Sequence, residues 1–193
     1  MGRRLLITGF DPFGGADINP AWEAVKQLPD RIGDFALCKL EIPTVFGEAG
    51  RQVLARATDF CPDVILCVGQ AGGRSAVTPE RIAVNIRDGK IPDNGGNQPE
   101  GDPVVPDGPA AYFSTLPVKA MAAAICAAGL PGMVSNSAGA FVCNDVLYTL
   151  LHHYAQTDVK VGFIHVPYLP EQGNPSLPLE DTVRALEAAI RVL

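Results

Sequence analysis

Residues 143–166, CNDVLYTLLHHYAQTDVKVGFIHV, place a helical pattern directly before a strand-like run. The segment 143–155 carries apolar residues at helical spacing, and 159–166 is an apolar run rich in valine, isoleucine and phenylalanine. A helix followed by such a strand is half of a crossover between parallel strands. The stretch therefore predicts an α/β fold with a parallel sheet.

The same alternation continues on either side of this unit. Further strands are predicted at 3–10, 35–43, 63–69 and 132–136, and further helices at 20–28, 46–60, 116–128 and 178–193. The last helix has the clearest pattern, because its apolar residues recur every three or four positions. Its stripe consists of Leu179, Val183, Leu186, Ile190 and Leu193. We expect helices on both faces of one mostly parallel sheet.

The length and composition of the chain limit the classes of function that it could have. The 193 residues suit one domain, 1–193, and the net charge of −6 comes without a basic cluster that would favour nucleic acid. No apolar run approaches the roughly 18 residues that span a membrane, and the N-terminus does not resemble a signal peptide. The five cysteines include no CxxC spacing, so neither disulfides nor a zinc site is expected. These features predict a soluble, cytoplasmic enzyme or binding protein in a reducing compartment.

Cys143 is the first candidate for a reactive group. It follows the predicted strand 132–136 after a small turn that contains Gly139, and it stands in the first turn of the helix 143–155. The unpaired N–H groups and the dipole at a helix start favour a thiolate and can bind an oxyanion. The alternative interpretation is an inert cysteine that packs against the sheet.

His165 is expected to arrive at the same edge of the sheet as Cys143. The helix 143–155 descends about 20 Å at 1.5 Å per residue, and the following strand returns about 20 Å at roughly 3.3 Å per residue. A thiol and an imidazole within reach form a nucleophile–base pair. A carboxylate must then orient the imidazole; Glu80 is the best candidate, and Asp11 is its competitor.

Other sequence motifs that could indicate a function are incomplete in this chain. The spacing of Gly9 and Gly14 resembles a phosphate loop, but Gly15 and Ala16 replace its lysine and its hydroxyl residue. Ser137 lacks the first glycine of a serine nucleophile elbow, and no histidine pair has metal-ligand spacing. The remaining polar candidates have structural interpretations. His152 and His153 are expected on the surface, and Asn144 and Asp145 at the helix start.

Five blocks together resemble the pyroglutamyl peptidase I family, from one end of the chain to the other. They are ITGFDPFGG with Asn19-Pro20, GQAGGRSAVTPERIAVN, IPDNGGNQP, SNSAGAFVCNDVLY and FIHVPYLPEQ. The resemblance implies an α/β/α sandwich with a phosphorylase-like sheet, commonly assembled as a homotetramer. It also implies a thiol peptidase that removes an N-terminal pyroglutamate from peptides without a cofactor or metal. Its Cys, His and Glu triad matches Cys143, His165 and Glu80.

The resemblance further implies a small pocket for the neutral lactam ring. Positions that flank the ring in the family match Phe10, Phe13, Ile91, Phe141 and Val142. Gln70 and Asn19 match residues that hydrogen-bond the ring or support the loop. For the phenylalanines, the sequence alone favours core packing, and only the resemblance indicates a place in the pocket.

This chain departs from the family at Lys90, where many members carry arginine just before the IPDN segment. Lys90 lies in the stretch 89–109, whose density of Pro, Gly, Asn and Asp predicts a long functional loop. Two other functions remain open. One is a non-catalytic relative that binds the same ligands, and the other is a thiol amidase for a different small head group.

Overall fold

Six strands form the central sheet in a computed structural model that describes residues 2–193. In order across the sheet they are β2 (Arg31–Ile32), β3 (Phe35–Ile42), β1 (Arg3–Phe10), β4 (Val64–Gln70), β10 (Lys160–Val166) and β5 (Thr78–Pro79). The four inner strands are parallel, and the two short edge strands are antiparallel to their neighbours. The mostly parallel sheet predicted from the sequence is confirmed.

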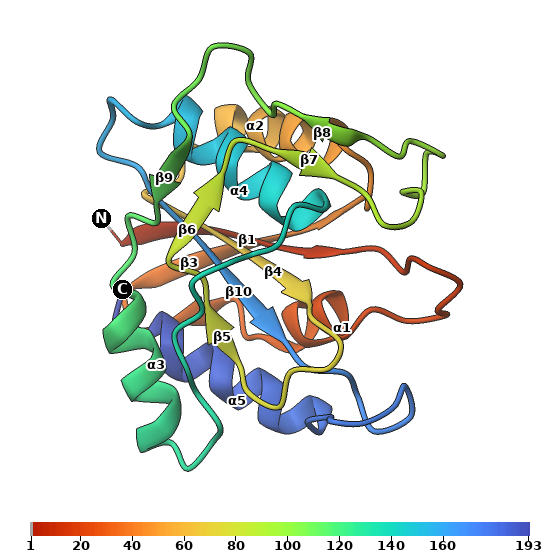
Figure 1. Ribbon diagram of the computed structural model, residues 1–193. Helices are drawn as coiled ribbons and strands as arrows, with labels where there is room; N and C mark the ends of the chain where they lie inside the picture. Colours follow the sequence, from red (N-terminus) through yellow and green to blue (C-terminus); the bar gives the residue numbers. More distant parts are fainter. Residues whose placement is uncertain (1) are drawn as a thin grey trace.

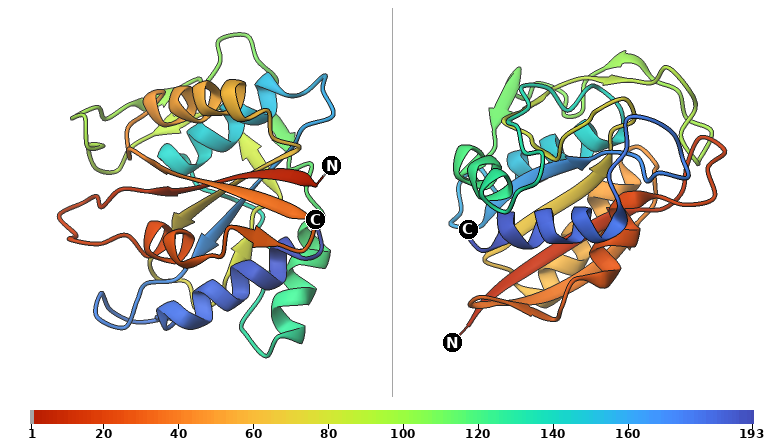
Figure 2. Two further views of the ribbon diagram at one scale, coloured as in Figure 1. Left: turned by 180° about the vertical axis from the view of Figure 1, so that it is seen from behind. Right: turned by 90° about the horizontal axis from the view of Figure 1, so that it is seen from below.

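Helices cover both faces of this sheet (Figures 1 and 2). On one face lie α2 (Glu48–Phe60) and α4 (Val142–His153); on the other lie α1 (Pro20–Gln27), α3 (Val118–Ala127) and α5 (Leu179–Ile190). Each face buries its own apolar cluster, so β1, β4 and β10 are buried on both sides, as central parallel strands are. The three-layer α/β/α arrangement is thereby confirmed. Within residues 2–193, no helix combines the length and apolarity needed to cross a membrane.

The strand predicted at 132–136 is wrong. This segment makes only two isolated bridges, Val77 with Gly132 and Glu80 with Ser135. Four backbone hydrogen bonds join residues 131–135 to residues 77–81, but Pro79 has no N–H to donate, so the ladder is interrupted and no regular strand forms. The segment runs along the rim of the molecule with Met133 60% exposed.

The loop 89–109 is irregular, as predicted, except for β8 (Glu100–Asp102), which pairs with β7 (Arg87–Asp88). A second small ladder joins β6 (Ile82–Val84) to β9 (Ala111–Phe113). The loop is held by the buried Asp93, whose carboxylate accepts backbone N–H bonds from Phe46, Gly95 and Asn97 at 2.8 Å. Burial opposes ionisation of Asp93, but these hydrogen bonds prevail and keep its pKa below the usual value.

The expectation that Asn144 and Asp145 simply stabilise the helix start is wrong. Both side chains are fully buried and tie α4 to other segments. The Asn144 amide forms three bonds of 2.8–3.0 Å with the backbone of Val84 and Ile86. Asp145 accepts from Arg87 Nε at 2.6 Å and from Gly47 N at 2.7 Å. These contacts fix the beginning of α4 against β6, β7 and the start of α2.

Replacing Asp145 with alanine should therefore destabilise the fold. The change leaves the half-buried Arg87 guanidinium and the Gly47 N–H without their partner, which costs about 3 kcal/mol or more. The measurement is the urea midpoint at constant slope. Asp30→Ala is the matched control: its carboxylate is 95% exposed beside Lys39, so a change within about 0.5 kcal/mol is expected. Equal losses in both variants would contradict the structural role of Asp145.

Candidate active site

The carboxyl ends of β1, β4 and β10 meet at one edge of the sheet, and the loops that follow them gather there (Figure 1). Cys143, the second residue of α4, places its sulfur against the end of β4. A Cβ atom on Gly69 would stand only 2.9 Å from Cys143 Sγ, so this position requires glycine. Gly69 in turn pairs with His165 on β10. The Cys143 sulfur and the His165 backbone therefore both lie beside Gly69.

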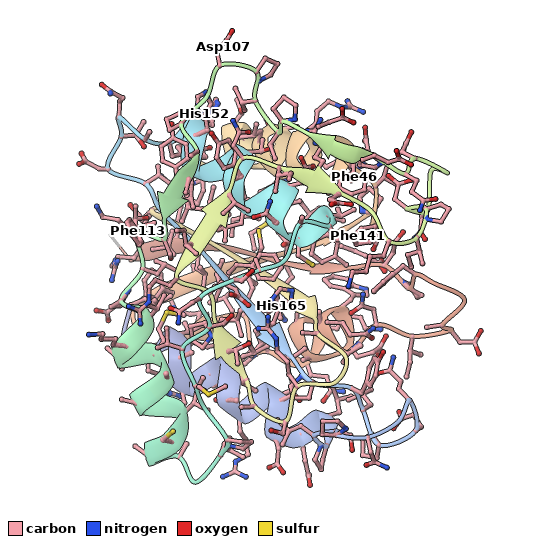
Figure 3. The ribbon with its side chains drawn as sticks, in the orientation of Figure 1. Phe46, Asp107, Phe113, Phe141, His152 and His165 are labelled. Atoms are coloured by element: carbon pink, nitrogen blue, oxygen red, sulfur yellow. The ribbon has the colours of Figure 1, made fainter. Side chains whose placement is uncertain are left out.

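His165 also points toward the α4 side of the sheet. It lies two residues after Phe163, and alternate residues of a strand share a face. The Phe163 ring packs 4.7 Å from the His165 ring and belongs to the apolar cluster beneath α4. Figure 3 shows His165 near the centre of the molecule, with Phe141 at the start of α4 above it. The imidazole therefore occupies the same side of the sheet as the Cys143 thiol.

Glu80 holds the other side of this imidazole. His165 Nδ1 lies 2.7 Å from Glu80 Oε1, and both side chains are buried. A proton on Nδ1 fits this bond, and it leaves Nε2 for the sulfur side. The competing carboxylate, Asp11, instead accepts from Thr44 N and Asn94 Nδ2. Of the two carboxylates, the structure brings Glu80 to His165.

Arg74 is a member of this cluster that the sequence analysis missed. Its Nη1 donates to Glu80 Oε1 at 2.6 Å and to Thr78 Oγ1 at 2.7 Å, and its Nη2 donates to the Ser137 carbonyl at 2.9 Å. Glu80 Oε1 therefore receives both the guanidinium and the imidazole. An arginine six residues before the candidate carboxylate was the available signal, but only the turn between them brings the two groups together.

The protonation states follow from burial and from these charges. Burial lowers the pKa of His165, and the Glu80 carboxylate only partly offsets that effect. Burial also opposes ionisation of Glu80, but hydrogen bonds and charge from His165 and Arg74 lower its pKa overall. Burial, followed by the nearby Glu80 charge, raises the pKa of Cys143 to about 12. Both shifts favour a neutral thiol beside a neutral imidazole, and they oppose the thiolate that the helix dipole favours.

The start of α4 offers free backbone donors beside Cys143. The residue before the helix, Phe141, supplies no side-chain cap, and the first bond of the helix runs from Asp145 N to Phe141 O. The N–H groups of Val142, Cys143 and Asn144 are thus left without helical partners. Such groups, aided by the helix dipole, can stabilise a negative oxygen.

A cavity of about 610 Å³ has in its wall Gln70, the residue that follows Gly69 in β4, while Cys143 and His165 themselves do not line it. It is lined by Phe13, Gly14, Gly15, Ala16, Asp17, Ile18, Gln70, Ile91, Tyr168, Glu171 and Gln172. Three of the predicted substrate-binding residues, Phe13, Gln70 and Ile91, are therefore in its wall. A fourth, Phe141, packs on Phe13 with ring centroids 6.1 Å apart and edge-on to Phe46 at 5.2 Å (Figure 3).

The other three predicted pocket residues lie behind the cavity wall. Phe10 and Val142 are buried in the core beneath α4. Asn19 is buried too, and both ends of its amide are occupied: Oδ1 accepts from Ala21 N at 3.1 Å, and Nδ2 donates to Asp11 O at 2.9 Å. Asn19 caps α1 and closes the loop 11–19, so of its two alternative roles the structure favours loop support.

The remaining sequence candidates lie outside this cluster. His152 and His153 are exposed, as predicted, and Lys90 is exposed in the long loop. Arg74 pairs with the buried carboxylate of Glu80, and Arg87 pairs with that of Asp145. Over residues 2–193, no three His, Cys, Asp or Glu side chains are grouped as metal ligands.

A cysteine beside a buried histidine that is held by a carboxylate, at the carboxyl edge of an α/β sheet, defines a cysteine hydrolase. The sequence pattern of the pyroglutamyl peptidase family matches residues 3–193. The pyrrolidone-carboxylate peptidase of Levilactobacillus brevis is 57% identical over 98% of this chain and 97% of its own length. That of Escherichia fergusonii is 54% identical over 97% and 91%.

Solved structures agree. Pyroglutamyl peptidase I of Bacillus amyloliquefaciens has a TM-score of 0.95 and 43% identity, covering 98% of this chain and 96% of that one. Pyrrolidone carboxyl peptidase of Thermococcus litoralis has a TM-score of 0.94 and 36% identity, covering 98% and 92%. The chain belongs to the pyroglutamyl peptidase family, the cysteine peptidases that remove an N-terminal pyroglutamyl residue.

Glu80 and Arg74 should shift the pKa of His165 in opposite directions. Wild-type His165 should titrate below 6.5. Glu80→Gln removes the anion that stabilises the imidazolium, so the pKa falls further; Arg74→Gln removes a repelling cation, so the pKa rises. Heteronuclear NMR of the ring nitrogens measures the pKa of His165 in both variants and in the wild-type protein. Shifts of the same sign in the two variants would contradict this electrostatic arrangement.

Proposed function

We propose that Cys143 is the nucleophile, His165 the general base and acid, and Glu80 the residue that orients the imidazole. One observation carries this assignment. His165 Nδ1 is bonded to buried Glu80, and Gly69, the strand position beside His165, lies so close to Cys143 Sγ that an added Cβ would stand 2.9 Å from it. The assignment gives each group a role that fits its environment. The neutral imidazole can accept the proton that the thiol must lose.

The reaction begins when Cys143 Sγ attacks the pyroglutamyl carbonyl carbon and its proton passes to His165 Nε2. The carbonyl oxygen becomes an oxyanion, for which the free N–H groups at the start of α4 are the proposed donors. The C–N bond then breaks as His165 returns its proton to the leaving amine, and a thioester remains. Water, deprotonated by His165, attacks the thioester and releases pyroglutamate and the thiol.

The proposed head-group pocket is the part of the cavity nearest Cys143. A lactam ring is small, flat and uncharged, so its site should be mostly apolar with a few aimed hydrogen bonds. Phe13, Ile91 and Phe141 are the proposed apolar walls, and Gln70 the polar contact. Phe10 and Val142 shape the pocket from behind, and Asn19 supports its loop. No cofactor or metal takes part in the proposed steps.

At the level of the whole molecule, we propose one catalytic domain over residues 1–193 and a cytoplasmic homotetramer that binds neither nucleic acid nor membrane. The five cysteines, all free, suit a reducing compartment. Phe113 and Met133 are 68% and 60% exposed, and burying such apolar side chains favours assembly. The tetramer itself rests on the family resemblance.

Release of a fluorescent amine from a pyroglutamyl-amide tests the nucleophile. Cys143→Ala should lower kcat on the order of 10⁴-fold or more, because no other group can form the acyl-enzyme. A thiol alkylator should abolish turnover and a metal chelator should leave it unchanged. The matched controls, Cys61→Ala and Cys126→Ala, remove exposed thiols and should retain activity. No turnover by the intact, reduced protein would mean that the triad is vestigial or the head group wrong.

A comparison of head groups tests the substrate. Pyroglutamyl-, prolyl- and glutaminyl-amides of the same fluorescent amine differ in the ring carbonyl and in the ammonium charge. The neutral lactam should be turned over, and the two cationic heads should be at least about 10³-fold poorer in kcat/KM, since an ammonium group would be desolvated without a partner. Comparable rates for the prolyl-amide would contradict a lactam-specific site.

A further inference from the structure

The hydrogen bonds of the Gln172 side chain show which of its amide atoms is the oxygen and which is the nitrogen. Its Oε1 accepts from the backbone N–H of Leu169 at 3.0 Å, and its Nε2 donates to the carbonyl of Ile18 at 3.2 Å. A backbone N–H can only donate and a backbone carbonyl can only accept. The oxygen and the nitrogen of Gln172 are therefore assigned by chemistry, without the ambiguity that usually attends a glutamine amide.

The orientation of the Gln172 amide also fixes the orientation of the Gln70 amide. The third bond of Gln172 runs from its Nε2 to the Gln70 side chain at 3.0 Å. Because Gln172 Nε2 is a donor, the Gln70 atom that faces it must be the oxygen. Gln70 Nε2 is thereby left as a donor, and within residues 2–193 it has no hydrogen-bond acceptor. The last residue of β4 thus presents an NH₂ group at the cavity, one position beyond Gly69.

The segment that carries Gln172 is itself held in place. Leu177 N bonds to Tyr168 O at 2.8 Å, and Gln172 N bonds to Leu169 O at 2.9 Å. The Tyr168 ring lies over Gly72, where an added Cβ would come within 2.2 Å of it. Through Ile18, Gln172 also joins this segment to the loop 11–19, which lines the cavity as well. The donor that orients Gln70 therefore has little freedom to turn.

We propose that Gln172 is a positioning residue that keeps Gln70 a hydrogen-bond donor, and that this donor selects head groups with a ring carbonyl oxygen. A lactam oxygen accepts from the Gln70 NH₂ group. A prolyl head has no such oxygen, and its ammonium would face a donor. With the Gln70 amide reversed, the cavity would present an acceptor and the selection would weaken. The inference rests on the proposed function, because it assigns the cavity to the substrate head.

Gln172→Glu is the decisive variant. A carboxylate can still accept from Leu169 N, but it cannot donate to Ile18 O or to Gln70. Gln70 should then turn its NH₂ group toward the new carboxylate and its oxygen toward the substrate. We expect KM for the pyroglutamyl-amide to rise about 10- to 100-fold, with kcat changed by less than about threefold. Gln156→Glu, an exposed change of the same charge, is the control and should leave both constants unaltered.

Two further measurements separate positioning from general damage. The affinity of 2-pyrrolidone for the Cys143→Ala protein, measured by calorimetry, should fall about 10- to 100-fold when Gln172→Glu is added. Gln70→Leu should cause a similar loss, and the double variant should be no worse than Gln70→Leu alone, because both act through one donor. Should Gln172→Glu fold poorly, Gln172→Met frees Gln70 without adding charge and should show a smaller loss of the same kind.

The outcomes are distinct. A KM and a lactam affinity that change by less than twofold in Gln172→Glu overturn the inference, as do fully additive losses in the double variant. The proposed function fails separately, if the wild-type protein does not turn over the pyroglutamyl-amide. Lactam binding to Cys143→Ala needs no turnover, so it judges the role of Gln172 in either case.

Discussion

The hydrogen bond between Glu80 Oε1 and His165 Nδ1 is the contact around which the site is arranged. A buried carboxylate is costly unless it is paired, and here the imidazole and the Arg74 guanidinium both pair with it. The antiparallel pairing of β5 with β10, residue 78 beside residue 165, brings Glu80 to this place. A very short edge strand thus sets the distance between two catalytic candidates 85 residues apart.

The other half of the site depends on the anchoring of α4. Asn144 and Asp145 follow Cys143 directly, and the side chains of both form hydrogen bonds to β6, β7 and the start of α2. Because those side chains hold the helix by its first turn, Cys143 Sγ is fixed over Gly69 while the preceding backbone N–H groups stay free. Polar residues that would ordinarily cap a helix have been used instead to position it.

Much of the architecture could be predicted from the sequence. The strands near 3–10, 35–43, 63–69 and 159–166 and all five helices follow from local periodicity, which each segment carries within itself. Helix and strand lengths, which fix where a crossover returns, also predicted that Cys143 and His165 lie at one edge of the sheet, and in the structure both lie beside Gly69. The segment 132–136 was not predictable in the same way, since its pairing is interrupted at Pro79, which lies in a distant part of the sequence.

The sequence by itself determined the α/β class, the three layers and the family, because these depend on periodicity and on blocks of residues that are contiguous along the chain. Only the tertiary structure decided the surroundings that raise the pKa of Cys143, the pairing of Arg74 with Glu80 and the orientation of the Gln70 amide. Each of these is set by desolvation or by a directional bond to a residue that folding brings near. Burial and hydrogen-bond geometry are properties of the folded chain, and no local pattern of residues encodes them.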